Sequence, residues 1–190
     1  MKKRGDLSMT TRKVILDLAI TLDGFIEGPN GEVDWCIMDA EMEFPKFLSQ
    51  IDTIFYGRKS YDSWGHYKPK PKEPKSDQIM WTLIHSKKKY VFSNSPKAKA
   101  KNVTYIYDNI AEQVEALKQQ PGKDIWLYGG AGLITSFMNL GLIDEFRLSV
   151  HPVLLGAGKP LFVDIHERLH LQLVDTRTFS SGVVQLIYTR

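Results

Sequence analysis

Apolar segments and amphipathic segments alternate along the first 150 residues of the chain. Residues 14–20 form a nearly continuous apolar run rich in branched side chains, a pattern typical of a strand that is covered on both faces. Similar or alternating apolar segments predict further strands, over residues 51–56, 89–93, 103–107, 124–128, 145–155, 169–179 and 183–189. Ser180-Ser181-Gly182 separates the last two segments and predicts an antiparallel hairpin at the C-terminus.

Helical spacing of apolar residues separates most of these strands. The predicted helices lie within residues 39–50, 57–64, 76–84, 110–117 and 133–138. Pro45 must lie in the first turn of the first helix or kink it, and Ser76 is expected to cap the third. Asn109 and Glu112 resemble a capping box for the fourth. Because helices and strands alternate to about residue 150 and only strands follow, the pattern predicts one α/β domain with a mixed sheet.

The composition fits one ordinary domain that needs neither disulfides nor a structural metal. The 190 residues are 43% hydrophobic and 25% charged, and a domain of roughly this size buries about 70% of its unfolded surface. Cys36 is the only cysteine, so no disulfide can form within the chain, and no Cys/His cluster indicates a metal site. This cysteine usage favours the reducing cytoplasm.

Charge and hydropathy argue against nucleic acid and membrane partners. The net charge of +3 is too small for a general nucleic-acid footprint, although residues 68–101 are rich in lysine. No apolar run approaches the roughly 18 residues that cross a bilayer. Residues 1–12 are polar and basic, so we expect a flexible leader there, with the folded domain over residues 13–190.

Two strand-to-helix turns are suited to an anion. Glycines in Gly129-Gly130-Ala131-Gly132 let the backbone approach a ligand, and the free N–H groups of the following helix favour a phosphate. The same turn also fits a purely structural role in close helix packing. Gly57-Arg58-Lys59-Ser60 adds two cations and a hydroxyl at a second junction, where a solvated helix start is the simpler alternative. Together the turns favour one extended, phosphate-bearing ligand.

Other candidate groups are a serine, several acids and two aromatic residues. Ser93 follows a strand that begins in a lysine run, and with one of the lysines it could receive the 2′-phosphate that distinguishes NADP from NAD. A buried acid beside a bound heterocycle can relay a proton if desolvation raises its pKa. The acids near the first turn are Asp23, Asp34, Asp39, Glu41 and Glu43. Trp35 and Phe44 could stack on a flat ring, or simply pack in the core.

Taken in order, these pieces resemble the dihydrofolate-reductase-like superfamily, and most closely the reductase domain at the C-terminus of the bifunctional riboflavin-biosynthesis deaminase/reductase. The resemblance covers residues 13 to about 188 and depends on the order and spacing of several short motifs. These are Ala19-Ile-Thr-Leu-Asp-Gly-Phe-Ile26, Gly57-Arg-Lys-Ser-Tyr61, Lys89-Tyr-Val-Phe-Ser93, Trp126-Leu-Tyr-Gly-Gly-Ala-Gly132, Asp144-Glu145, Pro152-Val-Leu-Leu-Gly156 and Pro160-Leu-Phe162.

The resemblance implies a three-layer domain with a mixed, mainly parallel sheet of about eight strands that binds NADPH across its carboxyl edge. Gly129 and Gly130 would be joined by a cis peptide and open the helix over the pyrophosphate. Ala19 and Ile26 would flank the nicotinamide, and Ser93 would lie by the 2′-phosphate. The full set of implied cofactor-binding residues is Ala19, Ile26, Gly57, Arg58, Lys59, Ser60, Ser93, Gly129, Gly130, Ala131 and Gly132.

Two acids are the catalytic candidates that the resemblance suggests. Folate reductases place an acid on the first helix, and Glu41 is nearest to that position, with Asp39 and Glu43 as neighbours. Asp23, in Leu22-Asp23-Gly24, resembles an aspartate on the substrate side of the riboflavin-pathway reductases. The zinc signature of a deaminase, H-x-E with P-C-x-x-C, is missing from these 190 residues, so we expect a reductase domain without a fused deaminase.

The expected function is therefore NADPH-dependent reduction of a pyrimidine- or pteridine-like heterocycle by a cytoplasmic enzyme. Its most specific form resembles 5-amino-6-(5-phosphoribosylamino)uracil reductase of riboflavin biosynthesis. Dihydrofolate reduction is an alternative, which requires Glu41 to be buried. A regulatory module that binds NADPH without catalysis is another. The family resemblance further implies a homodimer.

Overall fold

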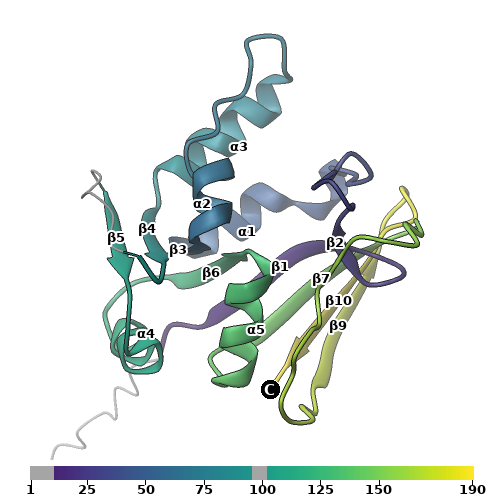
Figure 1. Ribbon diagram of the computed structural model, residues 1–190. Helices are drawn as coiled ribbons and strands as arrows, with labels where there is room; N and C mark the ends of the chain where they lie inside the picture. The colour runs from purple at the N-terminus through teal and green to yellow at the C-terminus, as the bar shows by residue number, and fades with distance from the viewer. Residues whose placement is uncertain (1–10, 96–101) are drawn as a thin grey trace, which may run out of the picture.

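The computed structural model of the chain describes residues 11–95 and 102–190. The strands of its main sheet are β1 (Val14–Thr21), β3 (Ile51–Gly57), β4 (Lys88–Phe92), β5 (Val103–Ile106), β6 (Asp124–Gly129), β7 (Glu145–His151), β9 (Gln172–Thr178) and β10 (Val184–Thr189). They lie in the order β5-β4-β3-β6-β1-β7-β10-β9 (Figure 1). Adjacent strands from β5 to β7 are parallel, and β10 is antiparallel to both of its neighbours, β7 and β9. The predicted mixed, mainly parallel sheet with a C-terminal hairpin is confirmed.

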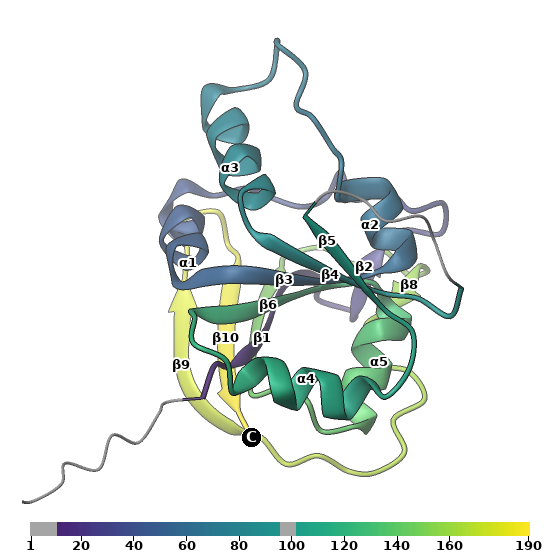
Figure 2. The same ribbon diagram turned by 90° about the vertical axis from the view of Figure 1, so that its left-hand side faces the viewer.

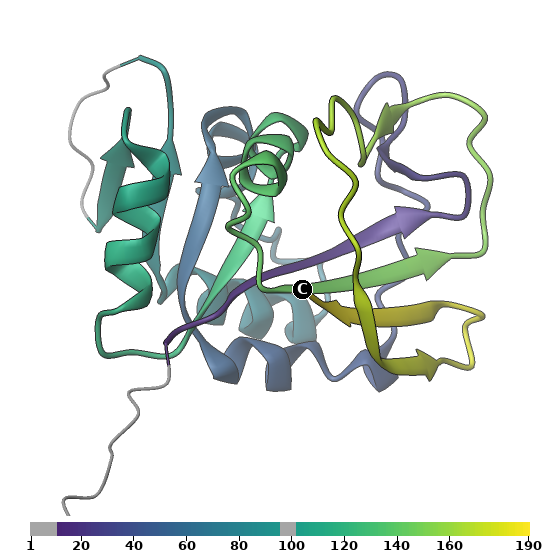
Figure 3. The ribbon, with the colours of Figure 1, turned by 90° about the horizontal axis from the view of Figure 1, so that it is seen from below.

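Helices cover both faces of this sheet. They are α1 (Phe44–Gln50), α2 (Arg58–Trp64), α3 (Lys75–His85), α4 (Ile110–Lys118) and α5 (Ala131–Asn139), with a 3-10 turn η1 (Ala40–Met42) before α1. The first three α-helices lie on one face, and α4 and α5 lie on the other (Figure 2). Seen from below, the β10–β9 hairpin lies to one side of α4 and α5 (Figure 3). The three-layer prediction is therefore confirmed.

Each face of the sheet has its own apolar core, because successive side chains of a strand point to opposite faces. Leu16 packs with Phe55 and Phe137 in the core under α4 and α5. Ile15 packs with Leu48 and Trp126 in the core under α1, α2 and α3. By the same alternation, the side chains at positions 17 and 19 of β1 point to the face that carries α1.

Some local predictions are wrong in detail. β7 ends at His151 rather than at residue 155, because the next residue, Pro152, has no N–H to donate to a ladder. Ser76 lies inside α3, whose N-cap is Pro74. Asn109 is the N-cap of α4 as predicted, but it has a left-handed conformation and makes no side-chain capping bond. The pattern also missed a small two-stranded sheet of β2 (Phe25–Glu27) and β8 (Lys159–Pro160).

The ordered domain begins earlier than the expected boundary at residue 13. Residues 1–10 of the expected leader lie outside the described residues. Arg12, which we placed in the leader, is only 5% exposed, and its guanidinium pairs with Asp52 and donates to the hydroxyl of Thr53 at 2.6 Å. This residue joins the start of β1 to β3 and is part of the fold.

Candidate functional site

The parallel strands bring most of the predicted cofactor residues to one edge of the sheet. β4, β3, β6 and β1 are consecutive neighbours, so their carboxyl ends lie side by side. Ser93 follows β4, Gly57 ends β3, Gly129 ends β6 and Ala19 lies near the end of β1. Ligands of open α/β sheets characteristically bind at this edge.

The two glycine turns predicted from the sequence face each other. A Cβ atom on Gly57 would lie 3.3 Å from the backbone nitrogen of Gly130, and one on Gly130 would lie 3.0 Å from the Ser60 hydroxyl oxygen. Gly129 has φ of 115°, a conformation that favours glycine, and the Gly129–Gly130 peptide bond is cis, as the resemblance implied. Gly130 is the N-cap of α5 and has no side chain to cap the helix, so the first N–H groups of α5 are available to a ligand.

The basic residues near this edge are placed differently from expectation. Arg58 pairs with Asp62 one turn along α2, at 2.7 Å, and Lys59 is exposed. Lys89 lies near the start of β4, at the end opposite Ser93, and donates to the carbonyl of His85 at 2.9 Å. The lysine run therefore does not supply a cation beside Ser93, whose own hydroxyl donates to the carbonyl of Ser95 at 3.0 Å.

A cavity of about 630 Å³ opens beside the glycine turns, on the face that carries α1 and α3. Small-molecule sites commonly measure about 300–1,000 Å³. Five of the predicted cofactor residues line it, namely Ala19, Ile26, Ser60, Gly129 and Gly130. Gly57, Arg58, Lys59, Ser93, Ala131 and Gly132 lie near the same sheet edge without being part of the cavity lining.

Aromatic side chains form much of the cavity wall. They are Trp35, Phe44, Phe47, Trp64, Tyr67, Trp81, Trp126 and Tyr128. Phe44 and Phe47 of α1 each meet the Trp126 ring edge-on, with centroids 5.5 and 5.7 Å apart. Trp35 and Phe44, for which the sequence left stacking and core packing open, both face the cavity. Such walls suit a flat ring.

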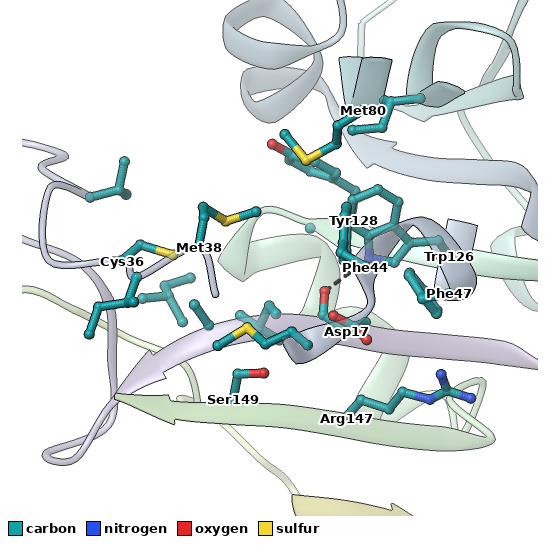
Figure 4. Close-up of a pocket in the computed structure, with 18 of the residues that line it drawn as sticks. Asp17, Cys36, Met38, Phe44, Phe47, Met80, Trp126, Tyr128, Arg147 and Ser149 are labelled. Carbon is teal, nitrogen blue, oxygen red and sulfur yellow. Dashed lines mark hydrogen bonds between the residues drawn. The ribbon is translucent and has the colours of Figure 1, made fainter. Parts of the chain in front are cut away.

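Asp17 is the acid at the floor of this cavity. It lies in the middle of β1 beneath Phe44 and Trp126 (Figure 4), and the Trp126 indole N–H donates to its backbone carbonyl at 2.9 Å. Burial among these side chains raises the pKa of Asp17 to about 7, an effect that nearby Arg147 opposes and nearby Glu145 adds to. A carboxyl group with this pKa can hold or release a proton at neutral pH.

The neighbouring strand β7 supplies the charged residues beside Asp17. Arg147 is the register partner of Asp17 across the β1–β7 ladder and also lines the cavity. Its Nε atom donates to the Glu145 carboxylate at 2.5 Å, and its guanidinium carbon lies 5.2 Å from the centre of the Phe47 ring. Farther along, Ser149 and Gln185 complete a polar strip on the floor, joined at 3.3 Å.

The two acids chosen from the sequence do not face the cavity. Glu41 is exposed, and its carboxylate accepts hydrogen bonds from the backbone and hydroxyl of Ser180. Asp23 is also exposed and accepts from Thr21 and from the backbone of residues 155 and 156, contacts that lower the pKa of its carboxyl group. Both carboxylates fix loops outside the cavity lining, so their assignment as candidate catalytic acids stays a prediction.

Asp17 was missed although the sequence contained a signal for it. The apolar run from Val14 to Ile20 has one charged residue, and that residue is Asp17. A lone acid in a strand covered on both faces must be compensated or kept for a function, because burying its charge is costly. Asp39 and Glu43, the neighbours considered beside Glu41, do line the cavity.

The residues at the sheet edge fit the NADPH that the resemblance implies. The close approach of Gly57 to Gly130 and of Gly130 to Ser60 leaves bare backbone where side chains would block a ligand. The start of α5 offers free N–H groups to a pyrophosphate, and Ser60 adds a hydroxyl. Among the described residues, no group of three or more His, Cys, Asp or Glu side chains could hold a metal, and no helix is long and apolar enough to cross a membrane.

The sheet order, the paired glycine turns and the cavity at the carboxyl edge define an α/β domain of the dihydrofolate-reductase-like class. Residues 12–185 match the RibD C-terminal domain family, so the chain belongs to that family. It is 63% identical over 181 residues to the uncharacterized protein YyaP of Bacillus subtilis (strain 168), covering 95% of this chain and 96% of that protein.

Solved structures share the fold at low sequence identity. A protein of Shewanella sp. PV-4 assigned to riboflavin biosynthesis has a TM-score of 0.76 and 22% identity, covering 94% of this chain and 98% of that one. A pyrimidine reductase-like protein of Corynebacterium diphtheriae has a TM-score of 0.66 and 15% identity, covering 94% and 91%. The family and its structural relatives are thus reductase-like.

Proposed function

We propose that this protein is an NADPH-dependent reductase of a flat pyrimidine- or pteridine-like heterocycle. The observation that carries the proposal is the continuity of the cavity, whose lining runs from the glycine turn at Gly129 and Gly130 to the ionisable floor at Asp17. One end suits the nicotinamide of a dinucleotide, and the other suits a ring that accepts a hydride and a proton. Membership in the RibD C-terminal domain family supports the reductase class.

The chain's own residues would do three things in such a reaction. Gly57, Gly130 and Ser60, with the first turn of α5, would hold the cofactor's phosphates, and NADPH supplies a hydride when bound. Ala19 and Ile26 would flank the nicotinamide at the cavity's edge. The aromatic walls would orient the substrate ring and exclude water, which strengthens every electrostatic interaction inside.

The most specific form of the proposal is reduction of a ribosylaminopyrimidine of the riboflavin pathway. It rests on the family, and on the polar side chains of Ser149, Gln185 and Arg177 in the cavity lining, which could bind the polar groups of such a substrate. The dihydrofolate alternative required a buried Glu41, and Glu41 is exposed. A regulatory module without catalysis predicts tight NADPH binding with no oxidation across a panel of heterocyclic substrates.

Cofactor binding is the first test. We expect NADPH to bind the purified protein more tightly than NADH in a titration of nicotinamide fluorescence. In the variant Gly130→Val, a side chain enters the space next to the Ser60 hydroxyl, so affinity should fall at least about tenfold, which corresponds to about 1.4 kcal/mol.

The control is Ala116→Val, which introduces the same valine side chain at an exposed position of α4 on the other face of the sheet. It should bind NADPH like the parent. Saturable binding of neither nucleotide would exclude the proposed function. Unchanged affinity in Gly130→Val would show that the cofactor binds elsewhere.

A further inference from the structure

Asp17 lies on the floor of the cavity, where desolvation makes an ionised carboxylate costly. Neither a hydrogen bond nor an ion pair reaches its carboxylate from the described parts of the chain, residues 11–95 and 102–190. Figure 4 shows it on the floor of the cavity, with Trp126 and Phe44 over it and Arg147 on the adjacent strand. A buried polar group without a partner in the protein is expected either to be neutral or to await one from a ligand.

The cation that could neutralise Asp17 is held by another residue. Arg147 and Asp17 are register partners on neighbouring strands, which lie about 4.8 Å apart, so an arginine side chain could reach the aspartate. Its Nε atom is bonded instead to Glu145, two residues back on the same face of β7, and its guanidinium lies over the Phe47 ring. The Glu145 side chain is only 8% exposed, and its carboxylate also forms an ion pair with the Lys13 ammonium group at 3.2 Å. The arrangement turns Arg147 away from Asp17.

We propose that Asp17 is the catalytic acid that donates a proton to the substrate ring during reduction, and that Glu145 is a positioning residue that keeps Asp17 protonated by holding Arg147. The proposal rests on the proposed reductase function and names the proton donor that this function needs. Asp17 and Ala19 lie two residues apart on the same face of β1, about 6.6 Å along the strand. A ring bound against the nicotinamide at Ala19 therefore lies within reach of the Asp17 carboxyl group.

The reaction that fits this arrangement is the reduction of a C=N bond that lies in the heterocycle or is conjugated to it. The carbon receives a hydride from the reduced nicotinamide, which is thereby oxidised, and the C=N π bond is broken. The nitrogen receives the proton of the Asp17 carboxylic acid through a new N–H bond. Asp17 is left as a carboxylate and regains its proton from water, which enters as product leaves. Protonation of the nitrogen makes the carbon a better hydride acceptor, which is the advantage of a general acid.

The elements packed around Asp17 contain few other charges that could set its ionisation. β7 presents Glu145, Arg147 and, farther along the same face, His151. Arg147 and Glu145 are the two charged groups that act on the Asp17 pKa. β6 presents Trp126 and Tyr128, and burial raises the pKa of the Tyr128 hydroxyl, so this residue stays neutral. α1 and the loop before it add Phe44, Phe47, the exposed Glu43–Lys46 pair and Cys36, whose thiol pKa burial also raises.

The test titrates Asp17 directly, in ligand-free protein labelled with ¹³C at side-chain carboxyl carbons. Comparison with Asp17→Asn identifies the signal, and its midpoint in the parent should lie near neutral pH. In Glu145→Gln, Arg147 is released to pair with Asp17, so the midpoint should fall by about 1 to 3 units. In Arg147→Met it should rise. The control Glu115→Gln removes an exposed acid on α4, beyond the other face of the sheet, and should leave it unchanged.

A double-variant cycle separates positioning from the direct charge of Glu145. If Glu145 acts by holding Arg147, the Glu145→Gln substitution should lower the midpoint much less in the Arg147→Met background than in the parent. Equal shifts in both backgrounds would overturn the positioning role. A parent midpoint near 4, the ordinary value for an aspartate, would overturn the acid role.

Contact with a ring is tested with two flat probes, lumazine and pterin, at millimolar concentration. Either should move the Asp17 carboxyl signal in the parent, and no movement with both would overturn the placement of Asp17 at the substrate. Because these measurements need no NADPH, they can succeed even if the protein binds no dinucleotide. In that case the proposed reductase function fails, while Asp17 remains the acid of a heterocycle-binding site.

Discussion

Replacing Asp17 by asparagine should stabilise the protein at alkaline pH and leave its stability nearly unchanged in acid. Asparagine has the shape of the protonated acid and never takes a charge. The folded protein raises the pKa of Asp17 from 3.8 to about 7, so the folded state binds this proton more tightly than the unfolded state. Stability linked to Asp17 is therefore fully present below about pH 4 and is lost progressively as pH rises to about 7.

The size of the effect follows from the same shift. At about 1.4 kcal/mol per pKa unit, the difference between 3.8 and about 7 corresponds to roughly 4 kcal/mol of destabilisation by the ionised carboxylate. Asp17→Asn should thus unfold at higher urea than the parent at pH 8, with a gain of up to about 4 kcal/mol. At pH 4 the gain should be below about 1 kcal/mol.

Urea unfolding followed by tryptophan fluorescence between pH 4 and pH 8 measures this difference. Asp175→Asn is the matched control, because it makes the same chemical change at an exposed carboxylate on β9. That variant should differ from the parent by less than about 1 kcal/mol at every pH. A gain for Asp17→Asn that is absent at pH 8, or equal at pH 4 and pH 8, would refute the reasoning that burial sets the ionisation of Asp17.

Two further substitutions test what holds the sheet in place. Arg12→Met should lower the free energy of unfolding by about 3–5 kcal/mol, because it leaves Asp52 partly buried without its cation. Urea denaturation measures this loss, and a loss below about 1 kcal/mol would contradict the structural role of the pair. Phe137→Ala should cost about 3–5 kcal/mol, since this fully buried ring packs against Phe55 between α5 and the sheet. The same change at Phe162, which is 47% exposed, should cost far less, and equal losses at the two positions would contradict the assignment of the core.

The fold was largely predictable because its strands are buried in a parallel sheet. Such strands are continuous apolar runs, as residues 14–20 and 51–56 are, and each run is recognised without knowing its neighbours. The glycine turns were predictable for a similar reason, since Gly129 needs a positive φ and Gly130 a bare backbone. The first requirement is local to the turn, whereas the second comes from Ser60 on a distant segment, although both favour glycine.

Glu41 lies outside the cavity lining because its orientation depends on backbone detail that apolar periodicity does not contain. The segment read as one helix over residues 39–50 is a short 3-10 turn and a separate helix α1, divided at Glu43, which has a left-handed conformation with φ of 49°. This break directs Glu41 toward Ser180 instead of toward the sheet. On a continuous helix over residues 39–50, the Glu41 side chain would point in a different direction from the one it has in the 3-10 turn.

The position of the cavity was encoded in the alternation along β7, a strand in the interior of the sheet. One face carries Phe146, Leu148 and Val150, and the other carries Glu145, Arg147, Ser149 and His151. An interior strand covered by helices on both faces would be apolar throughout, so its polar face must border a space that no helix fills. Asp17 is the one charged residue of β1, and β1 and β7 are adjacent and parallel. The charge pattern of two segments about 130 residues apart therefore located the cavity floor, once the strand order was known.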